Sequence, residues 1–148
     1  MPFTITKTFE FSAAHHLDHL PPGHPCARQH GHNYIVKVEL AASTRAVIDS
    51  PQKWVKDYGD LKALKDFIDF ELDHKDLNEV LTFDRTAIVD FTPTAEMLAY
   101  FLFSWCIKLW PEVIAVSVSE TPKVWATYRA GNPIEQIEGV EPDVWTTS

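Results

Sequence analysis

Residues 4–41, TITKTFEFSAAHHLDHLPPGHPCARQHGHNYIVKVELA, decide the fold, because they contain two alternating segments separated by a proline-rich loop. Alternation of apolar and polar side chains is the period of a β-strand with one buried face. The shared face consists of Phe9, Phe11, Ala13 and His15 on residues 4–15, and of His30, His32, Tyr34, Val36, Val38 and Leu40 on residues 30–41. Residues 16–29 carry three prolines and a glycine and are typical of a loop. We therefore expect the two strands to pair in antiparallel fashion.

Helical periodicity replaces this alternation after a polar connection at residues 43–54, which a proline interrupts. Residues 57–80 repeat leucine and isoleucine at helical spacing and predict a first long helix. Residues 91–111 predict a second helix, with Thr92 as its N-cap and Pro93 at its first helical position. This second segment is apolar nearly all round, so we expect it to be well buried or packed between subunits.

Two further alternating segments, residues 113–120 and 123–129, predict the last two strands. The element order ββααββ predicts an α+β fold, an antiparallel four-stranded sheet with two helices packed on one face. We expect a single domain over residues 1–148. Residues 131–148 show no clear period and are interpreted as a surface arm.

The composition restricts the partners and the compartment of the protein. The 148 residues carry a formal net charge of −8, which disfavours nucleic acids and anionic membranes because both attract basic surfaces. No apolar run reaches the ~18 residues of a membrane helix, and the N-terminus lacks a signal-peptide pattern. Cys26 and Cys106 do not make a disulfide framework and fit a reducing compartment. We therefore expect a cytoplasmic protein without nucleic-acid or membrane partners.

Six of the seven histidines and one of the two cysteines lie within residues 11–34, more than a folded core requires. His30 and His32 are two apart on a strand, so both imidazoles leave the same face, and His15 ends the neighbouring strand. Three such imidazoles would leave the fourth position of a zinc ion open, the arrangement of catalytic zinc sites. Cys26 leaves a second interpretation open, a closed Cys-His₃ structural site. Over an open metal the same cysteine would instead serve as a base or nucleophile.

Three further residues are candidates for the site. Asp73 and His74 lie at the end of the first predicted helix. Adjacent helical residues do not face each other, so these side chains can meet only where the helix ends. Glu120 ends the apolar face of the strand over residues 113–120. A carboxylate directed at a core needs hydrogen-bond donors, and a ligand with two adjacent N–H groups would supply them.

Six short motifs resemble, in order and spacing, the family of 6-pyruvoyl-tetrahydropterin synthases and 6-carboxytetrahydropterin synthases. They are FSAAHHL, CARQHGHNY, DYGDLK, LDHKDLN, PTAEMLA and SETP, and the resemblance runs from about residue 3 to residue 130. The single C-x₃-H-G-H spacing is similar to that of the bacterial 6-carboxytetrahydropterin synthases of queuosine and 7-deazapurine biosynthesis. The animal pyruvoyl-forming enzymes have a longer interval there. One position departs from the family pattern, because His16 stands where arginine is expected.

The resemblance implies a tunnelling-fold (T-fold) subunit, a Zn²⁺ cofactor, and a homo-hexamer built from two stacked trimers. Its implied roles are zinc ligands for His15, His30 and His32, a catalytic cysteine for Cys26, partners of that cysteine across a subunit interface for Asp73 and His74, and an anchor for the pterin ring for Glu120. The triphosphate of the substrate needs cations, for which Arg28, Lys123 and Arg129 are candidates.

The implied substrate is 7,8-dihydroneopterin triphosphate, converted to 6-carboxy-5,6,7,8-tetrahydropterin, acetaldehyde and triphosphate. In the sister reaction, the same residue types eliminate triphosphate and form 6-pyruvoyl-tetrahydropterin, and the cysteine-to-histidine spacing favours the first reaction. A third hypothesis is a zinc-bound scaffold or pterin-binding protein without turnover. Cys26, Asp73 and His74 argue against it, because a binding protein needs no base with its partners.

Overall fold

The chain forms one sheet with helices on one face in a computed structural model that describes residues 2–131. Five strands are hydrogen-bonded in the order β3-β1-β2-β4-β5. Their bounds are β1 Phe3–His15, β2 His30–Ala42, β3 Lys75–Asp76, β4 Val113–Thr121 and β5 Val124–Arg129. All neighbours are antiparallel except β3, which pairs with β1 in parallel. The predicted α+β class is confirmed, and the predicted number of four strands is one too few.

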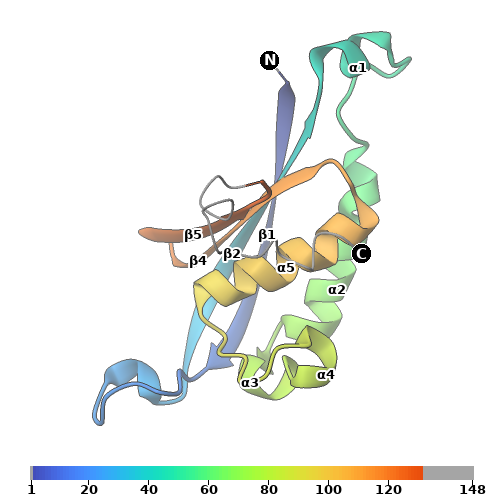
Figure 1. Cartoon of the computed structure of the whole chain (residues 1–148). Helices are drawn as coiled ribbons and strands as arrows, with labels where there is room; N and C mark the ends of the chain where they lie inside the picture. The colour runs from blue at the N-terminus through green and yellow to red at the C-terminus, as the bar shows by residue number, and fades with distance from the viewer. Residues whose placement is uncertain (1, 132–148) are drawn as a thin grey trace.

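The long β1–β2 hairpin forms the axis of the molecule, with the loop of residues 16–29 at one end (Figure 1). The register joins Phe9 to Val36 and Phe11 to Tyr34, so the two predicted apolar faces lie on the same side of the sheet. These side chains are buried, as a half-buried sheet requires. The sequence-based expectation for both strands is confirmed along their whole length.

The helical segments differ more from the prediction. Their bounds are η1 Pro25–Ala27, α1 Thr44–Asp49, η2 Tyr58–Leu61, α2 Lys62–Phe67, η3 Ile68–Leu72, α3 Leu77–Val80, α4 Phe83–Thr86 and α5 Ala95–Leu109. The single helix predicted over residues 57–80 is wrong, because the chain passes from a 3₁₀ turn through α2 into the π-helical turn η3 and then leaves the helix. His74 has φ of 59°, a left-handed backbone that ends the helical path before β3. The connection at residues 43–54 contains α1, which Ser43 caps.

Helix α5 begins two residues later than predicted. The side chain of Thr94 accepts a hydrogen bond from the amide of Met97, so Thr94 and not Thr92 is the N-cap. Pro93 consequently lies outside the helix, where it is buried. Its carbonyl oxygen is thereby free of the helical hydrogen-bond ladder and available to a side chain.

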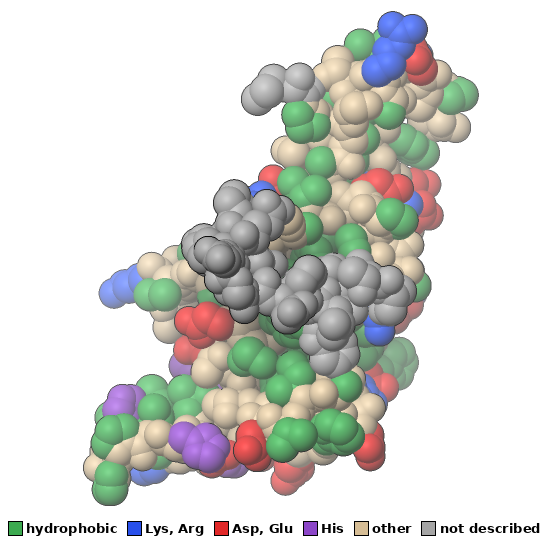
Figure 2. Space-filling view, viewed as in Figure 1, with side chains coloured by type: hydrophobic (Ala, Val, Ile, Leu, Met, Phe, Trp, Pro, Cys, Tyr) green, Lys and Arg blue, Asp and Glu red, His purple; other side chains and the backbone are tan. Residues whose placement is uncertain are grey.

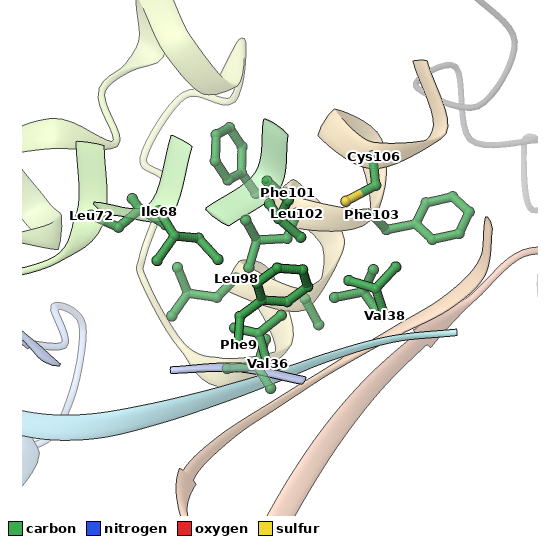
Figure 3. Close-up of a cluster of buried hydrophobic side chains, with 14 of the residues drawn as sticks. Phe9, Val36, Val38, Ile68, Leu72, Leu98, Phe101, Leu102, Phe103 and Cys106 are labelled. Atoms are coloured by element: carbon green, nitrogen blue, oxygen red, sulfur yellow. The ribbon is translucent and has the colours of Figure 1, made fainter. Parts of the chain in front are cut away.

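The core lies between α5, the α2–η3 segment and the inner face of the sheet (Figure 3). In Figure 1, α5 crosses the sheet and α2 runs along its side. Leu98 and Leu102 of α5 are fully buried, as are Val36 and Val38 of the sheet. Cys106 is buried in the same cluster, as a core residue would be, and burial raises the pKa of its thiol.

No helix in the described part of the chain is long and apolar enough to cross a membrane. The predicted surface arm at residues 131–148 lies outside the described residues apart from Gly131.

Candidate metal and catalytic site

The hairpin register brings three histidines together at the loop end of the sheet. His15 is directly opposite His30, and His32 lies two residues farther along the same face of β2. Their potential ligand atoms all lie within 4.8 Å of one another. Histidine side chains gather at this end of the molecule (Figure 2). The predicted His₃ cluster is therefore formed by two rigid strands within one subunit.

Backbone carbonyl groups fix the orientation of two of these rings. His15 Nδ1 donates to the carbonyl oxygen of Pro93 at 2.8 Å, and His30 Nδ1 donates to that of Arg28 at 2.6 Å. A carbonyl oxygen only accepts, so in each neutral ring the proton is on Nδ1 and Nε2 carries a lone pair. The two Nε2 atoms face each other at 3.0 Å. Two lone pairs at that distance repel unless a cation or a proton lies between them, so this geometry suits a cation.

His32 adds a third nitrogen to the cluster. Its Nε2 is buried and has no hydrogen-bond partner among the residues that the structure describes. The closest acidic group is Glu120, whose Oε2 lies 3.7 Å away. A buried polar atom without a partner needs an explanation, and a metal ion bound by this nitrogen provides one. The donor set of three imidazoles fits Zn²⁺.

The surroundings of His15 favour its neutral imidazole, the form that binds a metal. His15 is fully buried, and this burial lowers its pKa. Tyr34 lies beneath the cluster with its hydroxyl 3.2 Å from His15 Nδ1, and burial raises the pKa of Tyr34. The sequence places Tyr34 on the histidine face of its strand but does not predict this contact, nor the two carbonyl partners of the histidines.

Cys26 lies in the short 3₁₀ turn η1 within the loop of residues 16–29. His24 accepts a hydrogen bond from the amide of Cys26, and the carbonyl of Cys26 accepts one from the amide of Leu17 at 2.9 Å. The thiol is free and half-buried. Cys26 is not part of the cluster of potential ligand atoms found among the described residues. This placement favours the open His₃ arrangement over the closed Cys-His₃ site.

Asp73 and His74 form an ion pair where the helical segment ends. Asp73 Oδ2 lies 2.9 Å from His74 Nδ1, and the left-handed backbone of His74 lets these adjacent side chains meet. The amide of Ser12 donates to Asp73 Oδ1 at 2.9 Å, which ties the pair to β1. This bond is the largest cause that lowers the pKa of Asp73, followed by the His74 side chain. The imidazole of His74 is 81% exposed, so one side of it remains free for another group.

An open pocket of about 630 Å³ connects several of the predicted residues. Its lining includes His32, Tyr34, Asp73 and Glu120. That volume is within the range of small-molecule sites. A second cavity of about 360 Å³, between α2, α4 and α5, contains none of the predicted site residues.

The structure does not gather the three cationic residues that were candidates for the triphosphate. Arg28, Lys123 and Arg129 are exposed, and none of them lines the 630 Å³ pocket. Arg129 lies 3.4 Å from Glu39 in an ion pair. His16, which stands where the family pattern has arginine, contacts Gln29. Its Nδ1 lies 3.1 Å from Gln29 Oε1.

Comparison with known proteins gives one consistent family. Residues 4–131 match the family model described as 6-pyruvoyl tetrahydropterin synthase. A relative from Synechocystis named 6-carboxy-5,6,7,8-tetrahydropterin synthase is 34% identical over 101 residues, 68% of this chain and 71% of the relative. A relative of the same name from Aquifex aeolicus is 29% identical over 157 residues, 86% of this chain and 94% of the relative. The solved structure of Caenorhabditis elegans 6-pyruvoyl tetrahydropterin synthase is similar with a TM-score of 0.73 and 26% identity, over 88% of this chain and 97% of that chain.

We predict one zinc ion per chain, bound by His15, His30 and His32 and not by Cys26. Replacing Cys26 with alanine should leave the zinc content near that of the wild type, because the three imidazoles converge without it. His30→Ala should lose most of the metal, because two ligands remain. Metal analysis of purified, dialysed protein measures both. Loss of zinc in Cys26→Ala would establish the closed site instead.

Proposed function

The chain belongs to the 6-pyruvoyl tetrahydropterin synthase family, and on that basis we propose that it is a zinc-dependent 6-carboxytetrahydropterin synthase. The proposed reaction converts 7,8-dihydroneopterin triphosphate and water to 6-carboxy-5,6,7,8-tetrahydropterin, acetaldehyde and triphosphate. The observation that carries the proposal is the His₃ cluster beside a pocket that Asp73 and Glu120 line. The proposed place of the reaction is the cytoplasm, in queuosine or 7-deazapurine biosynthesis.

Two observations support the carboxy product over the pyruvoyl product. The relatives from Synechocystis and Aquifex aeolicus carry the 6-carboxy name, and the alignment with the second covers most of both chains. The C-x₃-H-G-H spacing holds Cys26 just four residues before His30, in the loop that ends at Gln29. The similar C. elegans structure carries the pyruvoyl name, so the fold is common to both reactions and does not separate them.

The donor set fits zinc, which when bound in an open His₃ site is a Lewis acid that polarises oxygen ligands and acidifies adjacent protons. The chain's own residues supply the remaining functions. Cys26, as a thiolate, removes a proton from the carbon side chain of the substrate. His74, held by the carboxylate of Asp73, returns a proton elsewhere on the substrate.

Glu120 holds the pterin ring in this proposal. Its carboxylate lies 3.9 Å from His15 Nε2 and 3.7 Å from His32 Nε2, at the wall of the 630 Å³ pocket. Half-exposed there, it is available to a ligand that enters the pocket. The 2-amino group and a ring N–H of a pterin form two parallel donors, which one carboxylate accepts in plane.

The active site is proposed to be shared between subunits of a homo-hexamer, a dimer of trimers. Within the described chain, the hydrogen bonds of the Cys26 backbone are local, and the ion-pair partner of His74 is its neighbour Asp73. The imidazole of His74 is largely exposed and is free to meet a neighbouring subunit. A non-catalytic scaffold is less well supported, because it would not need an imidazole oriented by a carboxylate.

Product analysis tests the reaction. Zinc-loaded protein incubated with 7,8-dihydroneopterin triphosphate should release acetaldehyde and 6-carboxytetrahydropterin in equal amounts, both identified by chromatography and mass spectrometry. The Cys26→Ala variant with normal zinc content is the matched control and should form neither. A 6-pyruvoyl product without acetaldehyde would establish the sister reaction, and absence of turnover would establish the scaffold.

The role of Glu120 is tested by Glu120→Gln, which keeps the shape of the side chain but replaces one acceptor by a donor. Binding of a pterin product analogue should weaken by about 2 kcal/mol, roughly 30-fold in Kd, the usual cost of mispairing a charged hydrogen-bond group. Zinc content should not change. Glu96→Gln, at an exposed position on α5, is the matched control. Wild-type affinity in Glu120→Gln, measured by calorimetry, would refute the anchor, and a loss in Glu96→Gln would transfer the role to Glu96.

Complementation tests the shared site. Cys26→Ala and His74→Ala subunits, dissociated, mixed in equal amounts and reassembled, should recover up to about a quarter of wild-type activity by random assortment around a closed ring. Each variant alone should be inactive. Verified mixed oligomers that stay inactive would place both residues of a site in one subunit.

A further inference from the structure

A closed ring of hydrogen bonds ties both ends of the Cys26 loop to the segment that follows His74. Four residues form the ring, and we name them the loop clasp: His16 and Gln29 at the two ends of the loop, and Asp76 and Asn78 from β3 and α3. None of them was a candidate for the metal, the proton transfer or the pterin ring. Gln29 is exposed, and the other three are half-buried.

At the start of the loop, the amide side chain of Asn78 binds the backbone of His16 at both of its polar groups. The His16 amide donates to Asn78 Oδ1 at 2.9 Å, and Asn78 Nδ2 donates to the His16 carbonyl at 3.0 Å. A side chain thus continues the hydrogen-bond pattern of the strand just past His15, where β1 ends. The first residue after a metal-binding histidine is thereby immobilised.

At the end of the loop, Gln29 bridges the remaining two members. Gln29 Nε2 donates to Asp76 Oδ2 at 2.9 Å, and Gln29 Oε1 accepts from His16 Nδ1 at 3.1 Å. The other carboxylate oxygen of Asp76 accepts a hydrogen bond from the backbone N–H of Asn78 at 3.0 Å, and Asp76 is thereby the N-cap of α3. Each bond of the ring joins one donor to one acceptor, so a single donor-to-acceptor change disrupts the ring.

The clasp is close along the chain to three of the proposed functional groups, His30, His74 and Cys26. Gln29 lies between Arg28, whose carbonyl orients His30, and His30 itself. Asp76 lies two residues after His74, and the backbone of His74 donates to the carbonyl of Ser12 in β1 at 2.6 Å. The loop carries Cys26, whose carbonyl oxygen accepts a hydrogen bond from the backbone amide of Leu17, the residue after His16.

We propose that Gln29 and Asp76 are positioning residues for catalysis, which hold the Cys26 loop in register with the metal-binding histidines. The proposal rests on the proposed function. Neither residue touches the substrate in this proposal. They act through the backbone of residues 16–29, by keeping Cys26 at a fixed place relative to His15 and His30. The histidine at position 16, where the family pattern has arginine, is a partner of Gln29 in this ring.

An exchange of donor and acceptor tests the bond between them. Gln29→Glu removes this bond by placing two carboxylates face to face. Asp76→Asn removes it by placing two amide N–H donors face to face. The double variant restores one N–H···O bond with its direction reversed, and the new amide oxygen at position 76 still accepts from the amide of Asn78. The introduced carboxylate at position 29 still accepts from His16 Nδ1.

For Gln29→Glu we expect kcat to fall about tenfold, with KM within about twofold, the ratio that follows when a positioned group is displaced without loss of ground-state binding. Zinc content should stay near one per chain. Amide hydrogen exchange of His16 and Leu17 should accelerate, because their acceptors are Asn78 Oδ1 and the carbonyl of Cys26. The double variant should recover most of kcat and the slow exchange.

Gln52→Glu is the matched control, because it makes the same change at an exposed position on the connection between α1 and η2. It should behave as the wild type. Unchanged kcat and exchange in Gln29→Glu, or a double variant no better than the worse single variant, would overturn the proposal. The exchange measurement uses zinc-loaded protein without substrate. A wild-type protein that forms no product would therefore contradict the proposed function, while the exchange data still decide whether the clasp orders the loop.

Discussion

The pairing of His15 with His30 across the β1–β2 hairpin is the constraint on which the site depends. A slip of one residue in this register would turn His15 to the opposite face from His30 and His32. The register is held by the pairs next to it along the hairpin, such as Phe11 with Tyr34, whose stacked rings have centroids 4.9 Å apart. Burial of ordinary core side chains thus sets the geometry of the three candidate metal ligands.

The packing of α5 against the sheet fixes the orientation of His15. Pro93 can accept from His15 because α5 begins only at Ala95, with Thr94 as its cap. Because Leu98 and Leu102 bury the same helix against the sheet, the position of that carbonyl is fixed by the core. A histidine ring whose Nδ1 donates a hydrogen bond to a fixed carbonyl presents its Nε2 in one orientation. This preorganisation reduces the entropy lost when a metal binds.

The strands and their histidine face could be predicted from the sequence, because both follow from the alternation of apolar and polar side chains along the chain. The sequence also indicates that Asp73 and His74 meet only where a helix ends, and the structure shows such an end with His74 in the left-handed region. It does not indicate β3, because a two-residue strand has no period. The carbonyl partner of His15 and the Gln29–Asp76 bond are equally hidden, since they join residues 78 and 47 positions apart. For the helix predicted over residues 57–80, the apolar spacing from Leu61 to Leu72 was right and the continuity was wrong. The π-helical turn η3 interrupts the helix but keeps Ile68 and Leu72 buried.

The candidate metal ligands and the proposed proton-transfer groups lie on parts of the fold with different rigidity. His15, His30 and His32 belong to two long paired strands, in which His15 is paired with His30 and His32 with Ala13. Cys26 lies in a three-residue turn, and His74 is a largely exposed residue at a helix end. Elements of this kind open locally at lower free energy than strands in a core. Under the proposed function, the reaction needs a thiolate and an imidazole at fixed places, so additional contacts must restrain both groups. The contact with Asp73 would restrain the imidazole of His74, and the loop clasp would restrain the segment that carries the thiol of Cys26.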